Sequence, residues 1–299
     1  MIIENINIAP EKKNVCLSAY IRDGGDLGGV KRPAVIVLPG GGYMACAPQE
    51  GKPVALRFAA MGYHSFVLKY STLFSVFPSK PDLSRANPGV HYPGPLEDLG
   101  RAIIAIRENA ERWSVDPDKI ILCGFSAGAH LAAMYATHWN RPELSYALGA
   151  GTNLLRPSAC ILCYGVFDLE TILDLNNEYK ELFSTFTYAL CGKKALSEEE
   201  MIKFSPVKHV GNHMPPSFIW ATAEDKMVPC ANSVNMALAM AEKNIPYELH
   251  IFEKGRHGLS LADESSAVTA EEINPHVANW VSLAEGWLKK RFSPGPQDM

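Results

Sequence analysis

The sequence lacks several features that would mark a membrane, secreted or nucleic-acid-binding protein. No apolar run reaches the roughly 20 residues needed to cross a membrane. The first residues contain no basic region followed by an apolar run, so no signal peptide is expected. The 28 basic and 32 acidic residues give a formal net charge of −4, and the basic residues form no cluster. Nucleic acids and membrane surfaces are therefore not expected as partners.

Arrangements of cysteine and histidine that mark metal sites or disulfide frameworks are also missing. There is no H-E-x-x-H motif. The seven cysteines are odd in number and several lie in apolar runs, which favours reduced thiols in a cytoplasmic protein. His209 and His213 have helical spacing, but Gly211 lies between them and Pro215 follows. We expect neither a metal nor a cofactor.

What is present is the composition of a globular α/β protein, with 47% hydrophobic and 20% charged residues. Alternating apolar positions predict two N-terminal strands at 2–8 and 15–21. Continuous apolar runs, typical of strands buried on both faces, follow at 34–38, 63–70, 120–123, 158–164, 217–221 and 247–252. Helical patterns lie between them, at 50–61, 95–113, 229–243 and 275–292 and in the segment after residue 128. This alternation predicts a mostly parallel central sheet with helices on both faces.

The chain is expected to form a single domain over residues 1–299. The connection at 165–216 is too long for a simple link between strands and contains helical patterns at 169–175, 178–190 and 197–204. We expect it to be a cap or lid inserted in the main fold. Three other segments are expected to be irregular: a surface excursion near the site at 71–95, a loop at 141–157, and a loose tail from Phe292 onward.

The clearest chemical signal is the segment KIILCGFSAGAHLAAMYATHWN at 119–140. An apolar strand leads into G-F-S-A-G at 124–128, and a helix rich in Ala and Leu follows. This is the G-x-S-x-G nucleophile elbow in its expected setting. A serine on so tight a turn leaves no room for side chains two positions away, which explains both glycines. The turn exposes the hydroxyl of Ser126, and the N–H of Ala127 can face a developing oxyanion.

A serine nucleophile needs a base, and the base needs a group that fixes its tautomer. In an α/β-hydrolase the chain order is serine, acid, histidine. Asp225 follows the strand expected at 217–221, and His257 follows the next strand in a glycine-flanked loop. Both positions and their order fit Ser126 as the nucleophile.

Other assignments of the acid stay open at this point. Glu224 is adjacent to Asp225 and follows the same strand, and Asp168 follows the strand expected at 158–164 but opens the insertion. Asp225 could also serve only to cap the next helix. The spacing D-x-x-V-P favours Asp225.

The run Gly40-Gly41-Gly42 follows a buried strand and has two chemical interpretations. Backbone N–H groups of Gly41 or Gly42 could form the first part of an oxyanion hole. Alternatively, the G-x-G-x-x-A pattern at 40–45 matches a loose dinucleotide-binding loop. The second interpretation needs an acid at the end of the next strand, yet residues 51–81 contain no Asp or Glu. A glycine turn without a chemical role also remains open.

Six segments carry a family resemblance: PGGGY at 39–43, GKPVALRFAAMGYHSFVLKYS at 51–71, PLEDLGRAI at 95–103, GFSAGAHLA at 124–132, EDKMVP at 224–229 and GRHG at 255–258. Together they resemble the α/β-hydrolase esterases. The sequence is most similar to the bacterial acetyl esterase and acetylxylan esterase group, which is related to hormone-sensitive-lipase-like and bifunctional feruloyl/acetyl xylan esterases. The resemblance covers most of the chain except the 165–216 insertion.

The resemblance implies a full set of site residues: Ser126 as nucleophile, His257 as base, Asp225 as its orienting acid, and an oxyanion hole from the backbone of Gly41 or Gly42 with Ala127. Two positions depart from the family pattern. Leu38-Pro39 stands where a histidine often begins the oxyanion motif, and Ala129 stands where glycine is usual. Neither change removes a catalytic atom.

The expected function is a cytoplasmic serine carboxylic-ester hydrolase that works through an acyl-enzyme. The resemblance alone suggests acetyl groups on sugars or xylo-oligosaccharides as substrate. Tyr43 and Tyr70, with Tyr92 and Trp139, could line a sugar cleft, although a buried core position is the more common role for any one of them. The alternatives are an arylformamidase or peptidase with the same triad, and a catalytically silent binding protein. Homo-oligomerisation is left open.

Overall fold

The computed structural model describes residues 1–12, 14–23, 30–79, 82–172 and 179–292. Two expected segments lie partly outside these residues. They are the tail from Phe292, of which only Phe292 is described, and the helix at 169–175, which is described up to residue 172. The strands are β1 (Ile2–Ile6), β2 (Cys16–Ile21), β3 (Arg32–Leu38), β4 (His64–Lys69), β5 (Val115–Phe125), β6 (Ala159–Cys163), β7 (Ser217–Thr222) and β8 (Tyr247–Phe252). The α-helices are α1 (Lys52–Ala60), α2 (Gly94–Glu108), α3 (Ala110–Trp113), α4 (Ala127–Ala136), α5 (Pro142–Leu148), α6 (Lys180–Cys191), α7 (Glu198–Phe204), α8 (Ala231–Glu242), α9 (Pro275–Ala278) and α10 (Trp280–Lys289).

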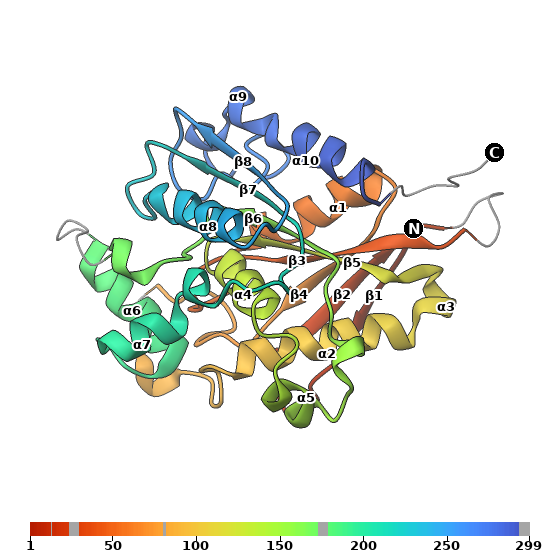
Figure 1. Cartoon of the computed structure of the whole chain (residues 1–299), viewed down its shortest axis with the longest axis horizontal. Coiled ribbons are helices and arrows are strands. Elements are labelled where there is room, and N and C mark those ends of the chain that lie inside the picture. The colour runs from red at the N-terminus through yellow and green to blue at the C-terminus, as the bar shows by residue number, and fades with distance from the viewer. Residues whose placement is uncertain (13, 24–29, 80–81, 173–178, 293–299) are drawn as a thin grey trace.

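The described strands form one twisted sheet in the order β1-β2-β4-β3-β5-β6-β7-β8 (Figure 1). From β4 to β8 every neighbouring pair is parallel. The two N-terminal strands pair antiparallel, β1 with β2 and β2 with β4. The mostly parallel sheet predicted from the alternation of strands and helices is confirmed.

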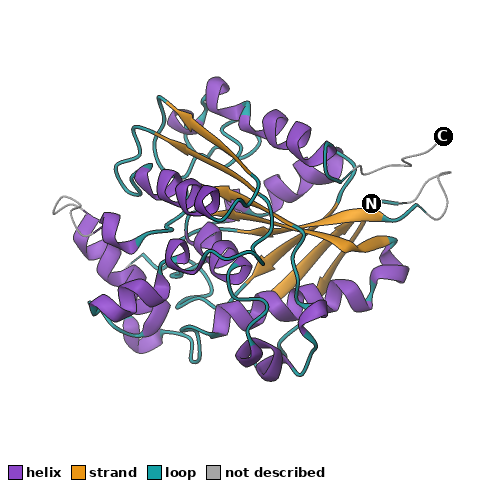
Figure 2. Ribbon diagram, viewed as in Figure 1, coloured by secondary structure: helices purple, strands orange, loops and turns teal. Residues whose placement is uncertain are grey.

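Helices cover both faces of this sheet (Figure 2). Alternate residues of β3 enter separate hydrophobic clusters, Ile36 with Leu38 in one and Val35 with Val37 in the other. The first cluster contains apolar residues of α2, α4 and α8, and the second those of α1 and α10. Because both faces are buried, β3 has no polar alternation, which is why it appears as a continuous apolar run.

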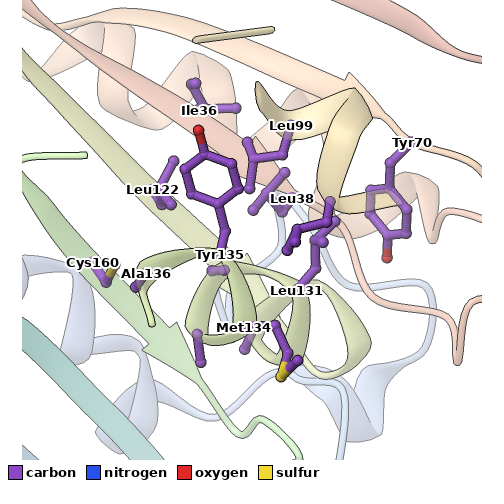
Figure 3. Packing of buried hydrophobic residues seen from close by; sticks show 14 of the residues in the cluster. Ile36, Leu38, Tyr70, Leu99, Leu122, Leu131, Met134, Tyr135, Ala136 and Cys160 are labelled. Carbon is purple, nitrogen blue, oxygen red and sulfur yellow. The ribbon is translucent and has the colours of Figure 1, made fainter. Parts of the chain in front are cut away.

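The first cluster is shown from close by in Figure 3. Ile36, Leu38 and Leu122 of the sheet lie against Leu99 of α2 and Tyr135 of α4. All five side chains are fully buried. The buried helix α4 carries Ser126 at its N-terminus, so this packing fixes the position of the elbow relative to the strand edges.

The segment 141–157 is not the loop expected from the sequence. It contains α5, which begins at Pro142 and ends before Gly149, a residue with φ of 61°. Proline in the first turn and a left-handed glycine just past the end are the standard boundary signals of a helix. The prediction of a loop was wrong because the helix is only seven residues long, too short for its apolar period to stand out.

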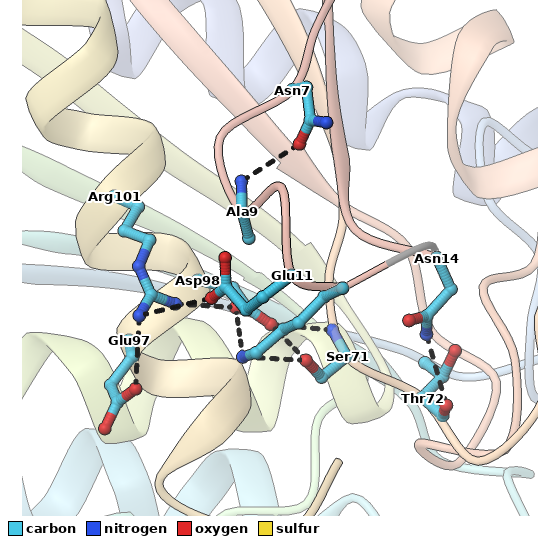
Figure 4. A network of polar contacts seen from close by, with 10 residues as sticks. Asn7, Ala9, Glu11, Asn14, Ser71, Thr72, Glu97, Asp98 and Arg101 are labelled. Carbon is cyan, nitrogen blue, oxygen red and sulfur yellow. Dashed lines mark hydrogen bonds and ion pairs between the residues drawn. The ribbon is translucent and has the colours of Figure 1, made fainter. Parts of the chain in front are cut away.

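Asp98 of α2 is fully buried and joins three segments of the chain (Figure 4). Its Oδ2 atom accepts hydrogen bonds from the backbone N–H of Ser71, at 2.9 Å, and from the Ser71 hydroxyl. Its Oδ1 atom accepts from Lys12 Nζ at 2.6 Å and from Arg101 Nη1 at 3.3 Å. These contacts hold the chain where it leaves β4, at the same sheet edge as the glycine run.

Substituting Asp98 with asparagine is expected to lower the free energy of unfolding by about 2–3 kcal/mol. The amide places a donor against Lys12 or Ser71, and removing one partner of a buried ion pair leaves the other uncompensated. Urea unfolding followed by circular dichroism measures the loss. The matched control is Glu97→Gln in the same helical turn, whose half-exposed ion pair with Arg101 is worth at most about 1 kcal/mol. Equal stability of the two variants would contradict the role given to Asp98.

Candidate active site

Ser126 lies at the turn between β5 and α4 with φ of 50° and ψ of −117°. A Cβ atom on Gly124 would lie 2.3 Å from the carbonyl oxygen of Gly128, and one on Gly128 would lie 2.0 Å from that of Leu38. Both glycines are therefore required by contact with backbone, as the tightness of the elbow predicts. The N–H of Ser126 donates to the Cys163 carbonyl at 2.9 Å, which anchors the strained turn to β6.

The structure brings Ser126, His257 and Asp225 together from the carboxyl ends of β5, β8 and β7. His257 Nε2 lies 2.8 Å from Ser126 Oγ, and its Nδ1 lies 2.6 Å from Asp225 Oδ2. Because an ionised carboxylate only accepts hydrogen bonds, Nδ1 carries the proton and Nε2 accepts from the serine hydroxyl. The Asp225 side chain is fully buried, and its Oδ1 accepts from the N–H groups of Met227 and Val228, both at 2.9 Å.

The electrostatic surroundings of His257 favour its protonated form. Burial alone lowers the pKa of His257, but the charge and hydrogen bond of Asp225, followed by the charge of Glu50, outweigh burial. The pKa is raised above its ordinary value of 6.5, although the Arg256 charge opposes the shift. A histidine with these neighbours is a good proton acceptor, which is what a general base requires.

The other two acids considered from the sequence lie in different contacts. Glu224 is exposed and its carboxylate accepts from Lys254 Nζ at 2.9 Å. Asp168 is buried, but its carboxylate accepts from Asn235 at 2.8 Å. Of the three acids, Asp225 is the one that the structure places against His257. It also caps the turn that follows it, so a structural role is added to the contact with histidine.

Gly41, Gly42, Ser126 and Ala127 line one cavity. Among the described residues, no hydrogen bond uses the N–H of Gly41, Gly42 or Ala127. Backbone N–H groups without a protein acceptor that lie beside a serine hydroxyl are suited to bind a negatively charged oxygen. The glycine run and the elbow line the same cavity, so both can contribute N–H groups to it.

The cavity above Ser126 has a volume of about 290 Å³ and mainly apolar walls. The insertion at 165–216 contributes much of the wall, with Val166, Ile172, Tyr179, Leu182, Phe183 and Phe186. Phe77, from the segment between β4 and α2, lies among the other apolar lining residues. Away from Ser126 and His257, the charged or amide side chains of the lining are Gln49, Glu50, Arg256 and Glu272.

The tyrosines expected to line a sugar cleft do not face this cavity, which corrects that expectation. Tyr43 is 2% exposed, and its hydroxyl bonds to His130 Nδ1 at 2.8 Å. Tyr70 is fully buried, and its hydroxyl donates to the Pro39 carbonyl at 2.6 Å. Tyr92 and Trp139 are also absent from the lining. The Tyr70 hydroxyl thus supports the backbone just before the glycine run, and the Tyr43 hydroxyl is bonded to a histidine side chain in the core.

Sequence reasoning missed Glu50 and the aromatic wall from α6. Glu50 was expected as a first-turn residue of a helix, but it lies in the 3₁₀ turn η1 (Pro48–Glu50), 3% exposed, ahead of α1. The one available signal was its isolation, since it is the only acidic residue between Asp26 and Asp82. For Phe183 and Phe186, periodicity shows an apolar helix face but not the cavity that the face meets.

The remaining candidates for a ligand are accounted for by internal contacts. His209 Nε2 bonds to the carbonyls of Ile202 and Lys203, and His213 Nε2 to that of Thr137. In the part of the chain that the structure describes, no group of three or more His, Cys, Asp or Glu could hold a metal ion. Across the same ranges, none of the helices has the length and apolar character to span a bilayer.

The fold and the arrangement of serine, histidine and acid are those of an α/β-hydrolase enzyme. The chain belongs to the BD-FAE family, whose model matches residues 27–240. An acetyl ester-xyloside bifunctional hydrolase from Caldicellulosiruptor lactoaceticus is 31% identical, with a TM-score of 0.71 over 92% of this chain and 88% of that one. A carboxylesterase from Lactobacillus plantarum WCFS1 is 27% identical, with a TM-score of 0.79 over the whole of both chains.

A curated relative extends the comparison to a longer protein. Endo-1,4-beta-xylanase B of Butyrivibrio fibrisolvens is 36% identical over 240 residues, which are 79% of this chain and 34% of that protein. The chain spans between 34% and 47% of the length of the first three curated relatives it matches. The similarity therefore concerns one part of each of those proteins.

Proposed function

We propose that the chain is a serine carboxylic-ester hydrolase in which Ser126, His257 and Asp225 form the catalytic triad. The observation that carries the proposal is the continuous hydrogen-bonded chain from Ser126 Oγ through the imidazole to Asp225, with contacts of 2.8 and 2.6 Å. Ser126 lies on a strained turn that exposes its hydroxyl, and this hydroxyl is hydrogen-bonded to a base. An activated nucleophile requires such a base. The esterases among its structural neighbours support an ester carbonyl as the target.

The proposed reaction proceeds in two halves. Ser126 Oγ attacks the ester carbonyl carbon while His257 Nε2 takes its proton, and Asp225 stabilises the resulting imidazolium. The tetrahedral oxyanion is held by the N–H of Ala127 and of Gly41 or Gly42. When the C–O bond breaks, His257 returns the proton to the leaving alcohol. Water, deprotonated by His257, then attacks the acyl-enzyme and releases the carboxylic acid and the free serine.

The proposed acyl group is acetyl, carried on a sugar or xylo-oligosaccharide. Support comes from the acetyl ester-xyloside hydrolase that shares the fold and 31% of its sequence. It also comes from the volume of about 290 Å³, which must hold the acyl group together with part of the alcohol. Polar groups suited to a sugar hydroxyl are few, with Gln49 and Arg256 the side chains that we assign to the alcohol side.

We also propose that residues 165–216 form a cap on a single hydrolase domain. The support is that six lining residues of the cavity come from this insertion. The proposed location is cytoplasmic, because all seven cysteines are free in the structure and reduced thiols persist in that compartment. Neither assignment depends on the chemistry of the site.

The function is tested by hydrolysis of p-nitrophenyl acetate, butyrate and octanoate. The value of kcat/KM is expected to be at least about tenfold higher for acetate than for octanoate, because each added methylene group of the acyl chain must fit into a cavity of limited volume. Matched acetanilide and N-formyl-aniline substrates test the amidase alternative and should be cleaved much more slowly. No turnover of any ester, or a preference for the amides, would contradict the proposal. A positive result on acetate is followed by acetylated xylo-oligosaccharides.

A further inference from the structure

Glu50 is a buried carboxylate beside the proposed reacting groups. Its side chain lines the cavity, and the residue is 3% exposed. The Oε2 atom accepts a hydrogen bond from the N–H of Gly40 at 2.7 Å, directly before the glycines assigned to the oxyanion hole. The Oε1 atom accepts from the hydroxyl of Tyr164 at 2.8 Å. One carboxylate therefore holds both the glycine run and a side chain at the end of β6.

The same network reaches the loop that carries His257. The hydroxyl oxygen of Tyr164 accepts from the N–H of Ser260 at 2.9 Å, and the Ser260 hydroxyl donates to the Gln49 carbonyl at 2.8 Å. The rings of Tyr164 and His257 are edge to face, with centroids 5.1 Å apart and planes at 72°. The turn around Glu50 thus links the oxyanion side of the site to its base.

No Lys or Arg neutralises this carboxylate among the described ion pairs. Burial raises the pKa of Glu50, while the hydrogen bonds of Tyr164 and Gly40 and the charge of His257 favour the ionised form. Desolvation makes a buried carboxylate unfavourable unless it is compensated. The group that becomes cationic beside it during the proposed reaction is His257.

We propose that Glu50 is a positioning residue of this site, anchoring the oxyanion glycines through Gly40 and stabilising the His257 imidazolium with its negative charge. The inference rests on the proposed function. It gives the site a second carboxylate: Asp225 orients the imidazole by direct contact, and Glu50 acts through the field and through the backbone. A carboxylate with only a structural role would not affect the stability of the His257 imidazolium.

Several charged and titratable groups face this pair. Around Glu50 they are Tyr164, His257, Glu272, Cys46, Tyr70 and Cys163. Burial raises the pKa values of the tyrosines and thiols in this set, so they remain neutral near pH 7. Around His257 they are Asp225, Glu50 and Arg256. Since the charge of Glu50 raises the pKa of His257, removing it must lower that pKa and shift the acid limb of activity to lower pH.

The test is the pH profile of kcat and kcat/KM for Glu50→Gln on p-nitrophenyl acetate. The amide keeps the size of the side chain and an oxygen for Gly40, so mainly the charge is lost. We expect kcat to fall roughly tenfold, because the charge that stabilises the imidazolium is lost, with KM nearly unchanged and the acid limb at lower pH. Glu50→Asp retains the charge, so its acid limb should stay at the wild-type pH even where kcat falls.

Asp98→Asn is the matched control, since it neutralises a buried carboxylate outside the site. It is expected to lower stability without moving the acid limb. Wild-type kcat and pH profile in Glu50→Gln would overturn the proposal, and so would equal shifts in Glu50→Gln and Glu50→Asp. If Glu50→Gln does not fold, Tyr164→Phe removes the donor to Oε1, and unchanged kcat in that variant is the overturning result. Failure of the proposed function is seen separately, as no turnover by the wild type.

Discussion

Substitution of Ser126 with alanine is expected to lower kcat on p-nitrophenyl acetate by roughly 10⁴- to 10⁶-fold, while the protein remains folded. The loss is large because the hydroxyl of Ser126 is the group that His257 Nε2 contacts at 2.8 Å, and alanine offers no nucleophile there. Alanine fits the same turn without new contacts, since it only removes an oxygen. The residual rate should reflect the backbone N–H groups and substrate binding, which the substitution leaves in place.

The control for this prediction is a buried serine outside the site. Ser233 of α8 is 1% exposed, and its hydroxyl has no hydrogen-bond partner among the described residues. Ser233→Ala should therefore retain wild-type activity and equal or slightly higher stability. A fluorophosphonate probe should label wild type and Ser233→Ala once, at Ser126, and leave Ser126→Ala unlabelled. Full activity of Ser126→Ala, or an adduct on another residue, would remove the proposed nucleophile.

The parts of the fold that could be predicted from the sequence depend mainly on interactions between residues close together in the chain. Strands buried on both faces leave continuous apolar runs, and β3 and β5 were recognisable for that reason. The elbow could also be predicted, since Gly124 and Gly128 are demanded by backbone contacts within that turn and with Leu38. The chain order of Ser126, Asp225 and His257 follows from the topology, because the carboxyl ends of parallel strands meet at one edge.

What could not be predicted depends on which surfaces meet. Tyr43 follows a strand and looks like a ligand contact, but its side chain turns into the core toward His130. Glu50 lies two residues before an amphipathic helix, and nothing local shows that the chain bends its carboxylate back onto Gly40. The apolar residues of α6 have the same periodicity whether they cover a core or a cavity. In each case the decisive contact joins residues distant in sequence.

Substitution of Asp225 with asparagine is expected to lower kcat/KM by about 10³- to 10⁴-fold at neutral pH, with little change in stability. The two oxygens of Asp225 have different partners. Oδ1 accepts from two backbone N–H groups, at Met227 and Val228, and Oδ2 accepts from His257. An amide NH₂ cannot face two N–H donors, so the asparagine oxygen must take the Oδ1 position. Its NH₂ group then faces His257 Nδ1.

That orientation reverses the tautomer of the base. With a donor opposite Nδ1, the imidazole proton moves to Nε2 and points at Ser126 Oγ. Nε2 then has no free lone pair with which to take the serine proton. The measurement is kcat/KM with the melting temperature, and Glu224→Gln is the control because Glu224 is exposed and bonds to Lys254. Glu224→Gln should stay within about twofold of wild type, as for surface ion pairs of little energetic weight. The two acids are adjacent in sequence but differ in burial and in partner, which makes Glu224 a close control. A large loss of activity in Glu224→Gln alone would transfer the orienting role to Glu224. A large loss in both variants would mean that the loop, rather than one carboxylate, holds the histidine.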